Sequence, residues 1–560
     1  MRVLGINSAF HDPAAALVID GVTVAAAEEE RFSRRKHGKR PVPFSSWEMP
    51  ELAARWCLRH AGLRAAQLDA VAFSYDPALA PASTAADLTA DGWEGLRTLY
   101  ASRAPRFLES ALPGSAHARC HFVPHHIAHA ASAFHASPFE SCAVLVLDGR
   151  GERASHLAGR ARSGQLRILA SQKLPHSLGL LYEELTEHLG FQRSADEYKV
   201  MALASYGRPT MLGRLRTAVR VNRDGGFVTE PIDWAGLAPP VADGESGSTQ
   251  AGADLAASVQ ARLEEVLLEL AWWLHERSGE PALALAGGVA LNCVANSRLW
   301  RDGPFDQVWV QPAAGDAGTA LGAAMHIAAQ GGDAICPIAA ADLGRGFSDE
   351  ELAGCLEAAG AVFERPADIA EVVADALAND AIVAWFQGRS EWGPRALGHR
   401  SLLADPRRAE NLDRLNEVKG REQFRPIAPM VLADRAQELF AGGPIPSPFM
   451  LFTHRVAPGW RERIPAVVHV DGTARVQTVD EFTQPLLARV LRGFERRTGV
   501  PVLVNTSLNT AGRPIVDDPR DALECFGSAP IDLLAIGPYF VRSPMAASAA
   551  QTRLAAAASA

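Results

Sequence analysis

The sequence has few of the features that would place the protein in a membrane, outside the cell or on a nucleic acid. Only seven of its 560 residues are cysteine and none forms a CxxC pair, so the scattered thiols indicate a reducing compartment. No run approaches the roughly eighteen apolar residues of a membrane-spanning helix. We expect no signal peptide, because polar residues follow the short apolar N-terminus. A formal net charge of −9 disfavours nucleic-acid binding, and we expect a cytoplasmic protein.

The length of the chain exceeds what one hydrophobic core normally supports. Apolar and charged fractions of 48% and 21% are ordinary for a globular protein. Residues 331–347 are rich in Gly, Pro and Ala, and Ser348 then begins a capping box with Glu351. The sequence therefore predicts domains at 1–340 and 348–545, followed by a disordered tail at 546–560.

Two histidines spaced four residues apart form the first candidate site. Segment 125–136 is rich in Ala and lacks Gly and Pro, which predicts a helix. His125 and His129 then share one face, with the spacing that two imidazoles need to hold one metal ion. Histidines that merely pack in a core are the alternative interpretation.

Carboxylates follow two of the predicted strands. The apolar run 143–147 predicts a buried strand that ends in Asp148-Gly149-Arg150-Gly151. Ligands of open α/β sheets bind at such strand ends, although an ordinary turn has the same composition. Asp316 follows a strand at 308–310. We expect the two carboxylates to come from the two halves of one domain and to point into a common cleft.

The arrangement of strands around these sites occurs twice. Three strands are predicted at 3–6, 14–19 and 22–27, and three more begin about 140 residues later at 143. This pattern indicates a duplicated α/β unit. The charge run 28–37 lies at a strand end, and both a solvated surface run and a substrate-side loop remain open.

Several other segments suit an anionic ligand. Gly287-Gly288 joins a buried strand to a helix, which lets a phosphate approach backbone amides, although tight packing would also require these glycines. Lys199 lies among small and apolar residues, unlike a solvated lysine. In the second half, arginines beside Gly, Pro and hydroxyl-bearing residues at strand ends suit a triphosphate.

Together these segments resemble one family, the O-carbamoyltransferases that modify antibiotics, other natural products and nodulation factors. The resemblance covers nearly the whole chain, in order. The motifs are FHDPAAAL, AEEERFSRRKH, HHIAHA, LDGRGE, EYKVMALASYG, GGVALNCVAN, GDAGTALGAA, GRSEWGPRALGHRS, REQFRPIAP, HVDGTARVQ and NTSLN.

The resemblance implies an α/β protein with two domains. The first would be an actin-like duplicated ATPase core similar to tRNA threonylcarbamoyl transferases, and the second would resemble enzymes that make threonylcarbamoyl adenylate. ATP and carbamoyl phosphate would yield carbamoyl adenylate in the second domain. In the first, a hydroxyl of an antibiotic, macrolide, polyketide or sugar would take the carbamoyl group and release AMP. The oligomeric state stays open.

The resemblance also implies residue roles. His11 would be the catalytic base, with Asp12 beside it. A divalent metal would be bound by His125, His129 and Asp316, with iron as first choice and zinc, manganese or magnesium as alternatives. The carbamoyl adenylate site would comprise Asp148, Gly149, Gly151, Lys199, Gly287, Gly288 and Asn292. ATP and carbamoyl phosphate would bind Arg395, Lys419, Arg425, Arg475, Ser507 and Asn509.

Two alternatives share the implied folds. A tRNA threonylcarbamoyl-type modification enzyme is disfavoured by the acidic charge, and an actin-like ATP-dependent switch or scaffold would need neither the histidine pair nor the basic second domain. Segments 75–118 and 208–250 match no family pattern, and we expect them to bind the acceptor.

Overall fold

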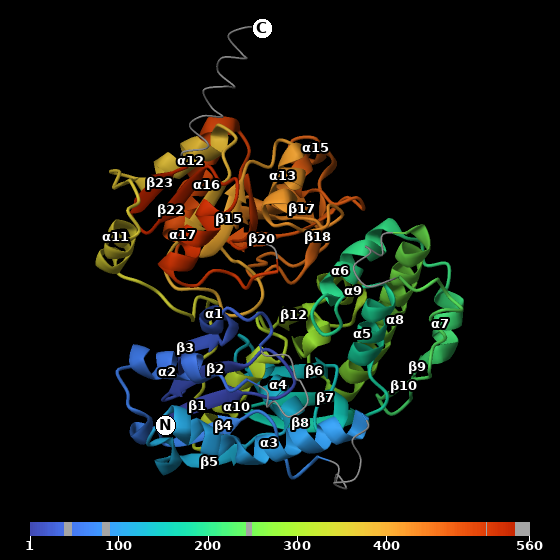
Figure 1. Cartoon of the computed structure of the whole chain (residues 1–560). Coiled ribbons are helices and arrows are strands. Elements are labelled where there is room, and N and C mark those ends of the chain that lie inside the picture. Colours follow the sequence, from blue (N-terminus) through green and yellow to red (C-terminus); the bar gives the residue numbers. More distant parts are fainter. Residues whose placement is uncertain (39–47, 81–89, 242–248, 511, 544–560) are drawn as a thin grey trace. The chain divides into compact units, whose positions relative to one another are not determined.

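The computed structural model describes residues 1–38, 48–80, 90–241, 249–510 and 512–543. The chain forms two compact units, Met1–Ala339 and Ala340–Ala560 (Figure 1). The tail for which disorder was predicted, 546–560, lies outside the described residues. Among the described helices, none is long and apolar enough to cross a membrane.

The first unit contains two five-stranded sheets with the same strand order. In each, the first three strands form an antiparallel meander, and on its other side the first strand is followed by two strands that run parallel to it. The predicted duplicated, actin-like α/β core is therefore confirmed. The first sheet is ordered β3 (Val22–Glu28), β2 (Ala14–Ile19), β1 (Arg2–Asn7), β4 (Ala70–Phe73), β5 (Arg119–Phe122). The second is ordered β8 (Gln165–Lys173), β7 (Ala154–Arg162), β6 (Ser141–Leu147), β11 (Ala282–Ala286), β12 (Gln307–Val310).

Two helices cross between the repeats. Helix α4 (His125–Phe134) follows the first sheet in sequence but packs on β6, β7 and β11 of the second. Helix α10 (Ala317–Gln330) follows the second sheet but packs on β1, β2 and β4 of the first. The two helices also pack on each other, at the centre of the unit in Figure 1. This exchange brings the first turns of α4 and α10 together, and with them the candidate ligands.

The first unit contains further helices and one hairpin. These elements are α1 (Glu30–Ser33), α2 (Glu51–His60), α3 (Ala90–Ala111), α5 (Leu178–His188), α6 (Glu197–Leu203), α7 (Leu212–Ala218), α8 (Gln250–Ser278), α9 (Cys293–Asp302), and the hairpin β9 (Val219–Val221) and β10 (Phe227–Thr229).

The second unit is built on an eight-stranded mixed sheet with a separate three-stranded sheet. Ser348 caps α11 as predicted, since its side chain accepts from the Glu351 amide. The large sheet is ordered β13 (Phe363–Glu364), β23 (Tyr539–Arg542), β22 (Leu533–Ile536), β14 (Val383–Phe386), β15 (Arg400–Ala404), β21 (Val502–Ser507), β16 (Ala428–Leu432), β20 (Gln477–Val479), and the small one β17 (Phe440–Ala441), β18 (Thr453–Val456), β19 (Thr473–Arg475). Its helices are α11 (Asp349–Ala358), α12 (Ile369–Ala378), α13 (Glu410–Val418), α14 (Ala436–Leu439), α15 (Pro458–Arg461), α16 (Pro485–Thr498) and α17 (Pro519–Gly527).

Two interpretations of the first unit are now decided. Of the two left open for the charge run, the solvated surface is wrong for its first residues, because Glu28, Glu29 and Arg31 are only 7%, 3% and 2% exposed. Glu29 accepts the amides of the first turn of α2, and burial raises the pKa of its carboxyl to about 7. The expectation that Asp148 and Asp316 come from different halves is also wrong. Both belong to the second repeat, and α10 carries Asp316 to the first sheet.

Gly322 allows the close approach of α4 and α10. A Cβ atom at Gly322 would lie 1.8 Å from the carbonyl oxygen of Ala128. We therefore expect Gly322→Ala to destabilise the protein by about 1–3 kcal/mol through overpacking, measured by thermal unfolding of the full chain. Gly213→Ala in α7 is the matched control, since nothing lies within 4 Å of its added Cβ. Unfolding of Gly322→Ala at the wild-type temperature would contradict the tight helix contact.

Candidate active site

Four buried side chains meet where α4 and α10 begin. The ligand atoms of His125, His129, Asp148 and Asp316 all lie within 4.8 Å of one another. His125 Nε2 is 3.5 Å from Asp316 Oδ1 and 3.7 Å from Asp148 Oδ2. The corresponding distances for His129 Nε2 are 3.6 and 3.9 Å. Asp148 therefore lies together with His125, His129 and Asp316, the three residues for which the family resemblance implied metal binding.

Three of the candidate ligand atoms in this cluster have no hydrogen-bond partner among the described residues. Among the described residues, neither His125 Nε2, His129 Nε2 nor Asp316 Oδ1 has a hydrogen bond. Buried polar atoms without partners are costly. Ligands at about 2.1 Å from one ion lie roughly 3.0–3.4 Å apart, so these four side chains fit a divalent metal after a small contraction.

The orientation of His125 is set by its other ring nitrogen. Its Nδ1 lies 3.0 Å from the carbonyl oxygen of Ser74, which makes Nδ1–H the donor. Nε2, the ring nitrogen that would bind a metal, then points into the cluster. Ser74 follows β4 of the first sheet, whereas His125 lies on α4, which packs on the second sheet. A residue of the first sheet therefore orients a candidate metal ligand that lies against the second sheet.

The cluster keeps its carboxylates ionised despite their burial. Burial raises the pKa of Asp316, but His11 and His125 outweigh it and hold that pKa well below its usual range. Burial and the nearby Asp316 raise the pKa of Asp148, but His125 and His129 outweigh them and hold that pKa below its usual range. Burial lowers the pKa of His125, while the two carboxylates raise it to about 10. Two fixed negative charges therefore face the imidazoles, which favours a bound cation.

His11 lies beside the cluster at the end of β1. Its Nδ1 is 2.9 Å from Asp12 Oδ2, and its Nε2 is 3.8 Å from Asp316 Oδ2. The buried Asn7 holds the loop, because its amide donates to the carbonyl oxygens of His11 and Asp12 at 2.9 and 3.0 Å. Ser74 donates to Asn7 Oδ1 at 3.2 Å. Asn7 and Ser74 were missed in the sequence, although both stand at strand ends.

The Gly287-Gly288 turn contacts the end of β6. The Gly288 amide donates to Asp148 Oδ1 at 2.8 Å. Gly287 has φ +91°, and a Cβ there would lie 2.1 Å from the carbonyl oxygen of Leu147. Tight packing therefore explains Gly287. Gly149 and Gly151 lie one and three residues after Asp148 in the chain.

Asn292 and Lys199 have protein partners. Asn292 Oδ1 accepts from the amide of Ala295, so it caps α9, and its amide exchanges hydrogen bonds with Gln260. Lys199 Nζ is 3.0 Å from Asp196 Oδ2. On the same helix, α6, burial raises the pKa of Glu197 to about 7, and His11 opposes the rise.

In the second unit, three of the predicted ligands meet. Lys419 Nζ donates to the carbonyl oxygen of Ser507 at 2.6 Å and to its Oγ at 3.0 Å, and also to the side-chain oxygen of Asn509. Lys419 ends α13, whose Asn416 donates to the carbonyl oxygen of Arg425 at 3.1 Å. These hydrogen bonds link Lys419 to the end of β21 and link its helix to the turn that carries Arg425.

The segments that carry Arg395 and Arg475 are tied to the same strand. Asn505, on β21, donates to the carbonyl oxygen of Ala396 at 3.0 Å and to Gln477 Oε1 at 2.6 Å. Gln477 Nε2 donates to the carbonyl oxygen of Leu397 at 2.8 Å. All six predicted residues of this unit therefore lie on mutually bonded segments.

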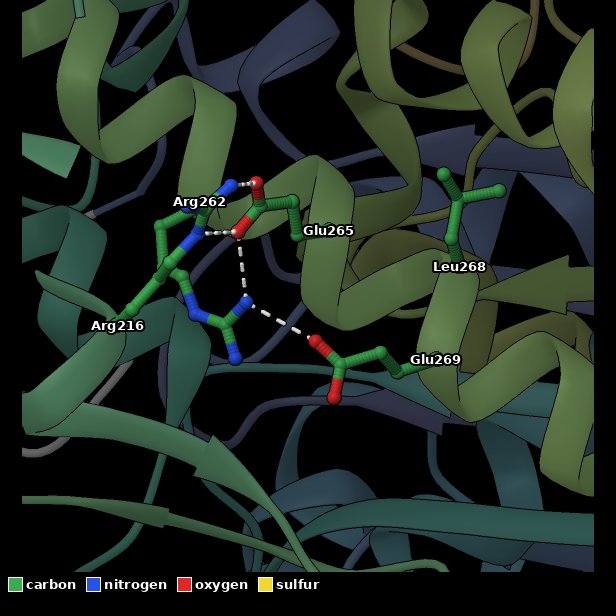
Figure 2. A pocket seen from close by; sticks show the side chains of 5 residues that line it. All are labelled: Arg216, Arg262, Glu265, Leu268 and Glu269. Atoms are coloured by element: carbon green, nitrogen blue, oxygen red, sulfur yellow. Dashed lines mark hydrogen bonds and ion pairs between the residues drawn. The ribbon is translucent and has the colours of Figure 1, made fainter. Parts of the chain in front are cut away.

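In the first unit, a hollow between α7 and α8 is lined by none of the predicted site residues. It has a volume of about 500 Å³ and is lined by Arg216, Arg262, Glu265, Leu268 and Glu269 (Figure 2). Figure 2 shows both arginines paired with the glutamates; Arg262 Nη1 is 2.8 Å from Glu265 and 3.0 Å from Glu269. Its two positive and two negative charges compensate one another, so it does not select an ionic ligand.

The first unit combines a duplicated, actin-like α/β core with a buried cluster of two histidines and two aspartates, and the imidazole of His11 lies beside that cluster. The chain belongs to the carbamoyltransferase family: the models described as carbamoyltransferase N-terminus and carbamoyltransferase C-terminus match residues 2–325 and 374–543. It is accordingly a carbamoyltransferase.

Relatives are similar over most of the chain. An uncharacterized protein of Synechocystis is 38% identical, over 96% of this chain and 95% of its own length. The nodulation protein NolNO of Sinorhizobium fredii is 38% identical, over 98% of this chain and 81% of its own length. The nodulation protein NolO of Bradyrhizobium diazoefficiens is 41% identical, over 75% and 78%.

We expect His129→Ala to reduce bound metal at least about tenfold, because replacing even groups outside the ligand set typically costs 10–100-fold in metal affinity. The measurement is elemental analysis of purified full-length protein after equilibration with iron, zinc or manganese. His117→Ala, an exposed histidine of the same unit, is the control. Metal content equal to wild type in His129→Ala would remove the histidine pair from the ligand set.

Proposed function

We propose that the chain is an ATP-dependent O-carbamoyltransferase that forms carbamoyl adenylate from carbamoyl phosphate and ATP, and transfers the carbamoyl group to a hydroxyl of a small natural product. The observation that carries this proposal is the placement of His11 Nε2 at the edge of the buried cluster, 3.8 Å from Asp316. A base is thus available where a carbamoyl group could be held. The acceptor proposed is an antibiotic, a macrolide or polyketide, or a sugar.

In the transfer step, the acceptor oxygen bonds to the carbamoyl carbon and the bond from that carbon to the oxygen of AMP breaks. The hydroxyl proton passes to His11 Nε2, while Nδ1–H stays bonded to Asp12. Asp12 fixes the ring and balances the charge that the ring gains. A divalent metal bound by His125, His129, Asp148 and Asp316 would supply the Lewis acid that polarises the carbamoyl oxygen.

Burial also favours this step. The cluster residues are at most 5% exposed, so water does not compete at the carbamoyl carbon from that side. Burial lowers the pKa of His11, but Asp316 and Asp12 raise it to well above the usual value. A cation held by the cluster would offset these carboxylates, so that His11 would be neutral and able to accept a proton.

The second unit would make the donor. Carbamoyl phosphate, ATP and one water would give carbamoyl adenylate, phosphate and pyrophosphate. Both reactants are anions, which suits a site built from arginines and a lysine. Lys419 would serve as the centre of this site, since it already gathers the oxygens of Ser507 and Asn509; phosphate oxygens could take part of that coordination.

The test is ATP–pyrophosphate exchange with labelled pyrophosphate. We expect exchange only when carbamoyl phosphate is present. Arg475→Ala should slow it about 10- to 100-fold, because a hydrogen bond to a charged group contributes about 1.5–3 kcal/mol. Arg455→Ala is the control, since Arg455 is exposed on β18 beside the strand of Arg475.

One outcome would contradict the proposed reaction, and another would contradict only the assignment of Arg475. Exchange that does not depend on carbamoyl phosphate would exclude carbamoyl adenylate as the intermediate. Equal exchange rates for the Arg475 and Arg455 variants would remove Arg475 from the donor site while leaving the reaction itself in place.

A further inference from the structure

The carboxylate of Asp12 is shared by two histidines. Its Oδ2 lies 2.9 Å from His11 Nδ1, and its Oδ1 lies 2.9 Å from Nδ1 of His37. Resting on the proposed function, we propose that His37 is a positioning residue: it holds Asp12 so that Asp12 can hold the catalytic base. The sequence motif that contains His37 suggested only a charge run or a substrate-side loop.

His37 is itself firmly held. Its amide donates to Glu30 Oε2 at 2.8 Å, and its carbonyl oxygen accepts from the amide of Asp12 at 3.3 Å. The two loops are therefore joined through both backbone and side chain. Helix α1, which carries Glu30, is the element that supports the second loop.

Both loops adopt a backbone that few residues other than glycine favour. Asp12 has φ +50° and His37 has φ +60°. Such conformations persist where surrounding contacts enforce them, and they concentrate at functional sites. The strain on each side of the Asp12–His37 bond indicates that this contact is built into the fold.

The two hydrogen bonds to Asp12, one at each carboxylate oxygen, restrict the rotation of its side chain. A carboxylate held at one oxygen can rotate in the broad, two-fold well of its terminal torsion. With each oxygen bonded to a different imidazole, that rotation is blocked. The Nδ1–H of His11 then keeps its partner, and Nε2 stays directed towards Asp316. Displacement of a catalytic group by about 1 Å can lower the rate about 100-fold.

A second metal site is the competing interpretation of the same residues. Single atoms of Asp12, Glu30 and His37 lie close enough to share an ion. However, both Asp12 oxygens already accept from imidazoles, and Glu30 already accepts from the His37 amide. The geometry is satisfied by hydrogen bonds, so we assign the contact to positioning.

Two variants separate the role of the ring from the role of the backbone. His37→Gly deletes the ring and suits the positive φ. His37→Asn keeps an N–H donor near the position of Nδ1, and asparagine tolerates this backbone. His117→Gly, at an exposed position, is the matched control.

The first readout needs no acceptor. It is the NMR signal of the His11 Nδ1–H group in full-length protein with ¹⁵N-labelled histidine, assigned by its loss in His11→Asn. This signal should be sharp in wild type and in His37→Asn. In His37→Gly it should be lost to exchange with solvent. In single-turnover release of AMP from preformed carbamoyl adenylate, with glycerol as the hydroxyl probe, His37→Gly should be about 10- to 100-fold slower. Added imidazole should restore part of the loss, and metal content should not change.

An unchanged His11 signal in His37→Gly would overturn the positioning role. So would a slow His37→Asn variant that resembles His37→Gly. Loss of one metal per chain in His37→Gly would instead establish the second metal site. Failure of the proposed function is distinguishable, because wild type would then show no exchange dependent on carbamoyl phosphate.

Discussion

Asp148 and Asp316 place two negative charges in a space that side chains close off from water, and the first unit is arranged to compensate them. The compensation comes from imidazoles on α4 and from the loop after β1. This requires the final helix of each repeat to pack on the sheet of the other repeat. Without that exchange the histidine pair and Asp316 would lie on separate halves, and each buried charge would lack a partner.

The same exchange explains why chemistry is possible there. His11, held by Asn7 and Asp12, faces the cluster without belonging to it. A group bound at the cluster would therefore meet a base whose orientation is fixed in advance, and preorganisation of this kind lowers the barrier for transfer. The second unit uses a different principle, in which Lys419 gathers oxygens at a strand end.

Local patterns predicted much of this arrangement. The spacing of His125 and His129 indicated a shared face, the repeated strand pattern indicated the duplication, and Ser348 with Glu351 marked a helix start. Contacts between distant segments were not predictable in this way. Asp12 and His37 are 25 residues apart, and no periodicity reports that a carboxylate bridges two rings. The burial of Glu28, Glu29 and Arg31 could not be decided from the sequence for the same reason, because charge composition indicates exposure unless partners are known. Helix α10, which begins directly after Asp316 and places that residue beside Asp148, was not predicted from the sequence.

The most direct test of this account is single-turnover transfer from preformed carbamoyl adenylate by His11→Asn, a substitution that keeps size and polarity but removes the base. The account predicts transfer slower by about 10²–10⁴-fold, with bound metal and carbamoyl adenylate synthesis retained. A transfer rate close to that of wild type would contradict it and would assign activation of the hydroxyl to another group.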